Sequence, residues 1–240
     1  MSPLASAPTR AMVLAAGFGL RMRPLTLTTP KPLLKVAGQT MLDASLEHLR
    51  RAGVGRMVVN HHYLGEQIIA HCAALADVTL SDERDAVLET GGGVARALPL
   101  LGDQPFYVCN ADILWRDGPG LSALARLAAA WDDSKMDALL LLHPVASAFG
   151  YEGAGDYGLA ADGRAQHRGA SPRAPYVFTG VQILHPRLMA ARPVAAHFPL
   201  RVLYDAAEAQ GRLFGLIHDG GWFHIGTPEA LAALPALITP

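Results

Sequence analysis

Short apolar runs alternate with amphipathic segments up to residue 150, and this alternation limits the possible folds more than any other feature. The runs expected to form buried strands are residues 11–15, 56–60, 77–80, 105–109 and 137–142. The helices predicted between them are residues 41–52, 64–73, 93–98 and 121–131. In the first helix, Leu42, Leu46 and Leu49 share one face, and Gly53 follows as a cap. Strands that alternate with helices predict an α/β fold with a mixed, mostly parallel sheet covered on both faces.

The pattern changes after residue 150, where glycines and aromatic residues separate shorter runs. Residues 157–159 and 176–184 are predicted to form an added antiparallel lobe. A helix near 200–210, a strand at 213–217 and a helix from residue 228 complete the chain. Because no linker or repeat divides it, we expect one domain over residues 1–240, with a flexible N-terminal tail at 1–10 and no C-terminal β-helix.

The amino-acid composition limits the classes of molecule that this protein is expected to bind. The formal net charge is −1 and 51% of residues are hydrophobic, which is typical of a globular protein and argues against nucleic acid or an anionic membrane as partner. A phosphorylated ligand would therefore need a few local cations. The two cysteines, Cys72 and Cys109, show no disulfide or metal spacing, and no leader-like or membrane-spanning run is evident. We expect a cytoplasmic protein, either a monomer or a small homo-oligomer.

A glycine-rich loop follows the first predicted strand. It reads LAAGFGLRMRPLT from Leu14 and continues as PKPLL from residue 30. Ligands of α/β sheets bind at the carboxyl ends of strands, where glycines let backbone N–H groups approach phosphate oxygens. Arg21 offers a planar fork for phosphate and Lys31 a compact charge. A dinucleotide fingerprint would need glycine at Met22, and a P-loop would need Gly-Lys-Ser/Thr. The remaining alternative is a surface loop with solvated cations.

These two stretches resemble the opening motif of the sugar-1-phosphate nucleotidyltransferase superfamily, L-A-A-G-x-G-x-R-M-x-P-L-T followed by P-K-P-L-L. The resemblance extends along essentially the whole chain and implies a Rossmann-like nucleotidyltransferase fold. It implies that residues 15–21 wrap the triphosphate, with Arg21 on the leaving pyrophosphate and Lys31 near the reacting phosphates. The nucleotide-binding residues implied in this first part of the chain are Leu14, Ala15, Ala16, Gly17, Gly19 and Asn60.

A second glycine run reads LETGGG from Leu88. By resemblance, Glu89, Thr90, Gly91, Gly92 and Gly93 line the nucleobase pocket, and this variant is most similar to uridylyltransferases that act on N-acetylmuramate 1-phosphate. From the residues alone, the run is equally well explained as the beginning of a helix. The neighbouring pair His61-His62 follows a strand, and we expect it to be structural or at the pocket rim, because adjacent side chains on a strand point to opposite faces.

Asp112 closes the tripeptide Asn110-Ala111-Asp112 after a central strand, where a carboxylate suits Mg²⁺. The resemblance implies that Asp112 binds the catalytic metal. The family's second metal ligand is an aspartate in W-x-D-x-G-T-P-E, but this chain has His224 in that place. Imidazole suits softer metals than Mg²⁺. Either His224 binds Mn²⁺ or a similar ion, or Asp112, phosphates and water hold Mg²⁺ without it.

The resemblance places the sugar phosphate near a third group of residues. Relatives often have Glu-Lys-Pro at the position of His167-Arg168-Gly169, and Arg168 could replace that lysine on the phosphate or be a solvated side chain. The sugar-phosphate residues implied are Asn110, Arg168, Tyr176, Thr179 and Gly180.

The activity implied is transfer of a nucleotidyl group, most simply from UTP, to a sugar 1-phosphate such as N-acetylmuramate 1-phosphate in peptidoglycan recycling. A guanylyltransferase for mannose or heptose 1-phosphate is the alternative within the class. A glycosyltransferase that consumes UDP-sugars is disfavoured, because such enzymes normally have an Asp-x-Asp motif. In this chain Asn110 occupies the place of the first aspartate, and Asp112 that of the second. The substitution at His224 leaves a non-catalytic sensor of nucleotides or sugar phosphates as a further hypothesis.

Overall fold

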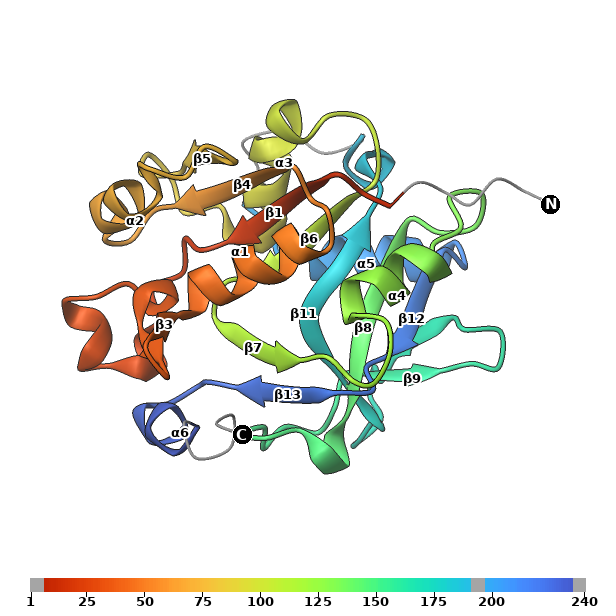
Figure 1. Cartoon of the computed structure of the whole chain (residues 1–240). Helices are drawn as coiled ribbons and strands as arrows, with labels where there is room; N and C mark the ends of the chain where they lie inside the picture. The colour runs from red at the N-terminus through yellow and green to blue at the C-terminus, as the bar shows by residue number, and fades with distance from the viewer. Residues whose placement is uncertain (1–6, 191–196, 235–240) are drawn as a thin grey trace.

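One mixed β-sheet forms the centre of the described structure, a computed structural model covering residues 7–190 and 197–234 (Figure 1). The strand order is β10-β9-β11-β6-β1-β4-β5, and β8 pairs with β11 and β12. Strands β6, β1, β4 and β5 are parallel, whereas β11 is antiparallel to β6 and β8. The strands are β1 (Arg10–Leu14), β4 (Arg56–His61), β5 (Val78–Asp82), β6 (Phe106–Asn110), β8 (Ala138–Pro144), β9 (Tyr157–Leu159), β10 (Ala165–His167), β11 (Tyr176–Leu184) and β12 (Leu213–Ile217).

Helices cover both faces of this sheet. One face is covered by α1 (Met41–Arg51), α2 (Gly65–Cys72) and α4 (Ala123–Ala130), and the other by α3 (Glu89–Leu101) and α5 (Arg201–Ala209). Successive residues of β1 serve the two layers, because side chains alternate along a strand: Val13 belongs to the core with α1, and Met12 to the core with α3. The predicted three-layer α/β architecture is therefore confirmed.

A two-stranded antiparallel ribbon lies beside the main sheet and was not predicted. It consists of β7 (Ile113–Arg116) and β13 (Gly221–His224), and it is followed by α6 (Pro228–Ala233) (Figure 1). The register sets His224 opposite Ile113. Residues from the far end of the sequence are thereby brought beside the end of β6. A smaller hairpin joins β2 (Lys35–Val36) to β3 (Gln39–Thr40).

Two boundaries differ from the sequence predictions. Helix α3 begins at Glu89, four residues before Gly93, so the glycine run lies inside the helix. The tail predicted over residues 1–10 lies mainly outside the described residues, but Arg10 belongs to β1 rather than to a tail. Strands β9 and β10 form an antiparallel hairpin added to the main sheet, as predicted for this part of the chain. Within residues 7–190 and 197–234, no helix combines the length and apolarity needed to cross a membrane.

Candidate active site

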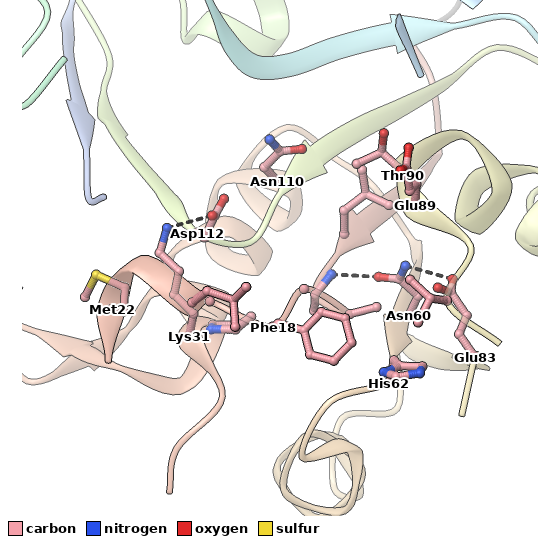
Figure 2. Close-up of a pocket in the computed structure, with 18 of the residues that line it drawn as sticks. Phe18, Met22, Lys31, Asn60, His62, Glu83, Glu89, Thr90, Asn110 and Asp112 are labelled. Atoms are coloured by element: carbon pink, nitrogen blue, oxygen red, sulfur yellow. Dashed lines mark hydrogen bonds and ion pairs between the residues drawn. The ribbon is translucent and has the colours of Figure 1, made fainter. Parts of the chain in front are cut away.

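A cavity of about 550 Å³ opens where β1, β4 and β6 end (Figure 2). This is the carboxyl edge of the parallel strands, where α/β sheets bind ligands. Its size lies within the usual range for small-molecule sites. The predicted residues that line it are Leu14, Ala15, Ala16, Gly17, Gly19, Arg21, Lys31, Asn60, Glu89, Thr90, Asn110 and Asp112.

The glycine loop is folded back onto Lys31. Gly19 has a φ of 61°, which glycine adopts without strain, and its carbonyl accepts a hydrogen bond from Thr26 Oγ1 at 2.9 Å. A side chain at position 19 would place Cβ 2.9 Å from Thr26 Cγ2 and 3.1 Å from Lys31 Cβ. This close packing holds Lys31, which is 6% exposed, at the cavity wall.

Lys31 and Asp112 form an ion pair at the cavity wall, with 2.7 Å between Nζ and Oδ2 (Figure 2). Asp112 is placed by the central strands, because the Ala111 N–H donates to the carbonyl of Leu14 at 3.0 Å. The hydrogen bond and the ion pair thus connect the end of β1, the segment that carries Lys31 and the end of β6 at one place in the cavity wall. A cation and a carboxylate at this point suit the binding and neutralisation of phosphate groups.

His224 lies next to Arg21 rather than in the cavity lining. The Arg21 guanidinium can only donate, so its Nη1 donates to His224 Nε2, at 3.5 Å. Burial, followed by the positive charges of Lys31 and Arg21, lowers the pKa of His224, which favours the neutral imidazole. The predicted neighbourhood of His224 and Asp112 is present, but the imidazole nitrogen already has a partner.

The donor set fits a divalent cation that is shared with a phosphorylated ligand. No group of three or more His, Cys, Asp or Glu side chains suited to a metal occurs among the residues described. Asp112 nevertheless offers a hard carboxylate, and Mg²⁺ is commonly held by one or two carboxylates plus substrate phosphates. The residues therefore fit an ion that substrate oxygens and Asp112 hold together.

A buried polar chain crosses the other side of the cavity, and Glu83 is a member that the sequence analysis missed. Asn60 Oδ1 accepts from the Ala15 N–H at 2.6 Å, and Asn60 Nδ2 donates to Glu83 Oε1 at 2.8 Å (Figure 2). Burial raises the pKa of the Glu83 carboxyl group. Its position directly after β5, at the same sheet edge as Asn60, is the sequence signal that could have identified it.

The second glycine run begins helix α3, which is the alternative that the residues alone had left open. Gly91, Gly92 and Gly93 lie within α3 and outside the cavity lining, whereas Leu88, Glu89 and Thr90 do line it. The N–H groups of Gly91 and Gly92 both donate to the Phe198 carbonyl, at 2.9 and 3.1 Å. A Cβ on Gly91 would lie 2.4 Å from the Phe198 ring. Gly91 therefore allows Phe198 to pack against the helix, whereas a Cβ at Gly93 would lie 2.8 Å from Glu83 Oε1 and 2.9 Å from Asn60 Nδ2.

The expected sugar-phosphate residues are less closely gathered. Of these, Asn110 lines the cavity. Gly180 packs against the Asn110 side chain, since a Cβ at Gly180 would lie 2.8 Å from Asn110 Nδ2. Thr179 is buried and donates to the Leu141 carbonyl. Arg168 donates to the carbonyl of Ser171 within its own turn, at 3.0 Å. Arg168, Tyr176, Thr179 and Gly180 all lie outside the described cavity lining.

Aromatic residues form part of the rim. Phe18 is 40% exposed and contacts His62 and Tyr63, with ring centroids 5.4 and 5.5 Å away. His62 lines the cavity, whereas His61, the last residue of β4, is buried and lies outside the cavity lining, in agreement with the expectation that the pair would be structural or at the pocket rim. Phe18 was not predicted, because a single aromatic residue between two glycines has no sequence signal of its own.

Comparison with known proteins agrees with this geometry. A family model described as nucleotidyl transferase matches residues 10–167. The N-acetylmuramate alpha-1-phosphate uridylyltransferase of Caulobacter vibrioides is 42% identical over 97% of this chain and 98% of its own length. That of Neisseria meningitidis serogroup B is 36% identical over 95% and 97%. The mannose-1-phosphate guanylyltransferase catalytic subunit beta of Danio rerio matches only 44% of this chain and 31% of its own, at 36% identity.

Comparison with solved structures identifies the fold. A structure of UDP-glucose pyrophosphorylase with UDP-glucose has a TM-score of 0.75 at 16% identity, covering 95% of this chain and 97% of the other. The architecture is therefore the nucleotidyltransferase fold. Because the family model spans more than half of the sequence and full-length relatives share over a third of its residues, this chain belongs to the nucleotidyl transferase family.

Proposed function

We propose that this protein transfers the uridylyl group of UTP to N-acetylmuramate 1-phosphate, giving UDP-N-acetylmuramate and pyrophosphate. The observation that carries the proposal is the Lys31–Asp112 pair at the wall of a nucleotide-sized cavity. The sugar and the base are suggested by the two relatives that are similar from end to end. We place this activity in peptidoglycan recycling in the cytoplasm, carried out by a monomer or small homo-oligomer; the two free, buried cysteines agree with a reducing compartment.

The chemistry is an in-line attack by a sugar-phosphate oxygen on the α-phosphorus of UTP. This nucleophile is already an anion, so the protein needs no general base, and catalysis depends on positioning and charge neutralisation. Lys31 would leave Asp112 and align the reacting phosphates, while Arg21 would neutralise the departing pyrophosphate. A divalent cation, Mg²⁺ or Mn²⁺, held by Asp112 and phosphate oxygens would supply further neutralisation of charge.

Glu83 supplies a physical basis for the choice of base. Its Oε1 accepts from Asn60, which leaves Oε2 for a ligand in the cavity that Glu83 lines. An ionised carboxylate only accepts hydrogen bonds. It suits the N3–H of uracil and is unsuited to the N3 of cytosine or the N1 of adenine, which are acceptors. Cytosine and adenine offer only an exocyclic amino group on this edge, whereas guanine also presents a ring N–H, so a guanylyltransferase for mannose or heptose 1-phosphate is the second candidate function.

The test is pyrophosphate release with each of the four NTPs against N-acetylmuramate, N-acetylglucosamine, glucose, mannose and heptose 1-phosphates, with Mg²⁺ and with Mn²⁺. Release that requires UTP and N-acetylmuramate 1-phosphate supports the proposal, and the Lys31→Ala variant should lose most of this turnover while remaining folded. Preference for GTP with mannose or heptose 1-phosphate would establish the second candidate instead. Nucleotide binding without turnover across the panel would refute transferase activity towards these sugars and favour a sensor.

A further inference from the structure

His224 stands where a second carboxylate ligand would be expected, and its contacts indicate a different role. Its Nε2 accepts from Arg21 Nη1 at 3.5 Å, and the ring packs against two aromatic side chains that also contact each other. The centroid of Trp222 is 5.8 Å away at 31°, and that of Tyr151 is 6.2 Å away at 89°. The imidazole is therefore oriented by packing, with one nitrogen directed at the guanidinium.

Gly226 leaves the space that this contact requires. A Cβ at position 226 would lie 2.8 Å from His224 Nε2 and 3.3 Å from Arg21 Nη1. Any larger residue would force the two side chains apart. Gly226 also lines the cavity, so the Arg21–His224 contact lies at the cavity wall.

The charges around His224 disfavour a metal ion at this nitrogen. Arg21 contacts it directly, and the ammonium group of Lys31 lies close enough to act on it electrostatically. Asp112 is the nearby carboxylate, and Lys31 already neutralises it. A divalent ion bound by His224 would have to displace Arg21 and lie beside two cations.

From this geometry we propose that His224 is a positioning residue for Arg21 and not a metal ligand. The imidazole acceptor directs the guanidinium towards the pyrophosphate group, and Asp112 is the protein's carboxylate for a cation that arrives on phosphate oxygens. This inference rests on the proposed function, in which Arg21 binds the leaving pyrophosphate. A histidine is sufficient at position 224 for this role, because directing Arg21 requires only a hydrogen-bond acceptor, whereas binding Mg²⁺ would require a carboxylate.

The experiment uses pyrophosphate as the ligand, so it does not depend on which base or sugar the enzyme prefers. Pyrophosphate binding is measured by calorimetry for wild type, Arg21→Ala, His224→Ala, His224→Gln and the double alanine variant. We expect His224→Ala to weaken binding by roughly three- to tenfold, the effect of one ordinary hydrogen bond, because the contact is long and solvent-exposed. His224→Gln should restore it, because the amide oxygen also accepts from Arg21. The double variant should bind no more weakly than Arg21→Ala.

A second measurement follows Mn²⁺ binding to the enzyme–pyrophosphate complex by electron paramagnetic resonance. Pyrophosphate is added at saturating concentration for each variant, so that weaker binding of pyrophosphate does not affect the result. The Mn²⁺ affinity of His224→Ala should then equal that of wild type within about twofold. His71→Ala is the control for removal of a distant imidazole. A tenfold or greater loss of Mn²⁺ affinity in His224→Ala, or additive losses of pyrophosphate affinity in the double variant, would overturn the inference. If UTP and N-acetylmuramate 1-phosphate prove not to react, the proposed function fails, but these two binding results still decide the role of His224.

Discussion

Gly19 and Gly17 lie in the same loop, and the structure predicts different consequences for an alanine at each. At position 19 the alanine must adopt a φ of 61°, which costs an L-residue about 1–2 kcal/mol. Its Cβ also lies 2.9 Å from Thr26 and 3.1 Å from Lys31, so one of these must move. We expect Gly19→Ala to lower the free energy of unfolding by about 2–3 kcal/mol. Turnover should fall by about tenfold or more, because Lys31 is displaced from its position.

At position 17 a Cβ would meet no atom within 4 Å, and the backbone has no positive φ. Gly17→Ala should therefore change the free energy of unfolding by less than about 0.5 kcal/mol. If the loop binds phosphates through its N–H groups, the added methyl should instead raise the KM for UTP. Urea unfolding followed by tryptophan fluorescence, combined with a pyrophosphate-release assay, measures both effects. Equal destabilisation by the two substitutions, or wild-type stability and turnover in Gly19→Ala, would refute the reasoning.

Three further predictions concern stability and base selection. Asp137 is buried and accepts from two arginine side chains, so Asp137→Ala should lower the free energy of unfolding in urea by about 3 kcal/mol. The control is Lys135→Ala, which removes an exposed ion pair and should lower it by less than about 0.5 kcal/mol. Similar losses for the two variants would contradict this prediction. Burial lowers the pKa of His143 and of His218 from the ordinary 6.5, so the unfolded chain takes up protons first and the free energy of unfolding should fall as pH drops below about 6.5. His143→Gln should make that fall shallower, and an unchanged slope in urea titrations at pH 7 to 5 would count against it. Glu83→Gln gains a donor for the N3 of cytosine, so the ratio of CTP to UTP turnover should rise; no change in this ratio would remove Glu83 from base selection.

The phosphate side of the cavity was predictable because its residues lie in short motifs next to strand ends. Arg21 and Lys31 belong to one loop, and Asp112 follows a strand whose apolar run is plain in the sequence. A parallel sheet brings such strand ends to one edge, so local patterns were sufficient to place these residues together. The assignments of chemical roles to them stay predictions.

Other parts of the site depend on pairings that no local pattern encodes. The three glycines from Gly91 fitted a nucleobase loop and a helix start equally well, and the carbonyl that accepts from two of them belongs to Phe198, more than a hundred residues later. Glu83 becomes part of the cavity through Asn60 on the adjacent strand. The β7–β13 ribbon was missed because its strands are short and their pairing is non-local.

In the β7–β13 ribbon, the residue that faces Arg21 depends on the length of the connection between β12 and β13. Only four residue pairs define its register, and neighbouring side chains of a strand point to opposite faces. Loss or gain of a single residue between β12 and β13 that shifted this register would turn His224 away from Arg21 and present Phe223 or Ile225 there. The connection at residues 218–220 is thus a place where evolution or design could exchange the polar partner of Arg21 without altering the main sheet.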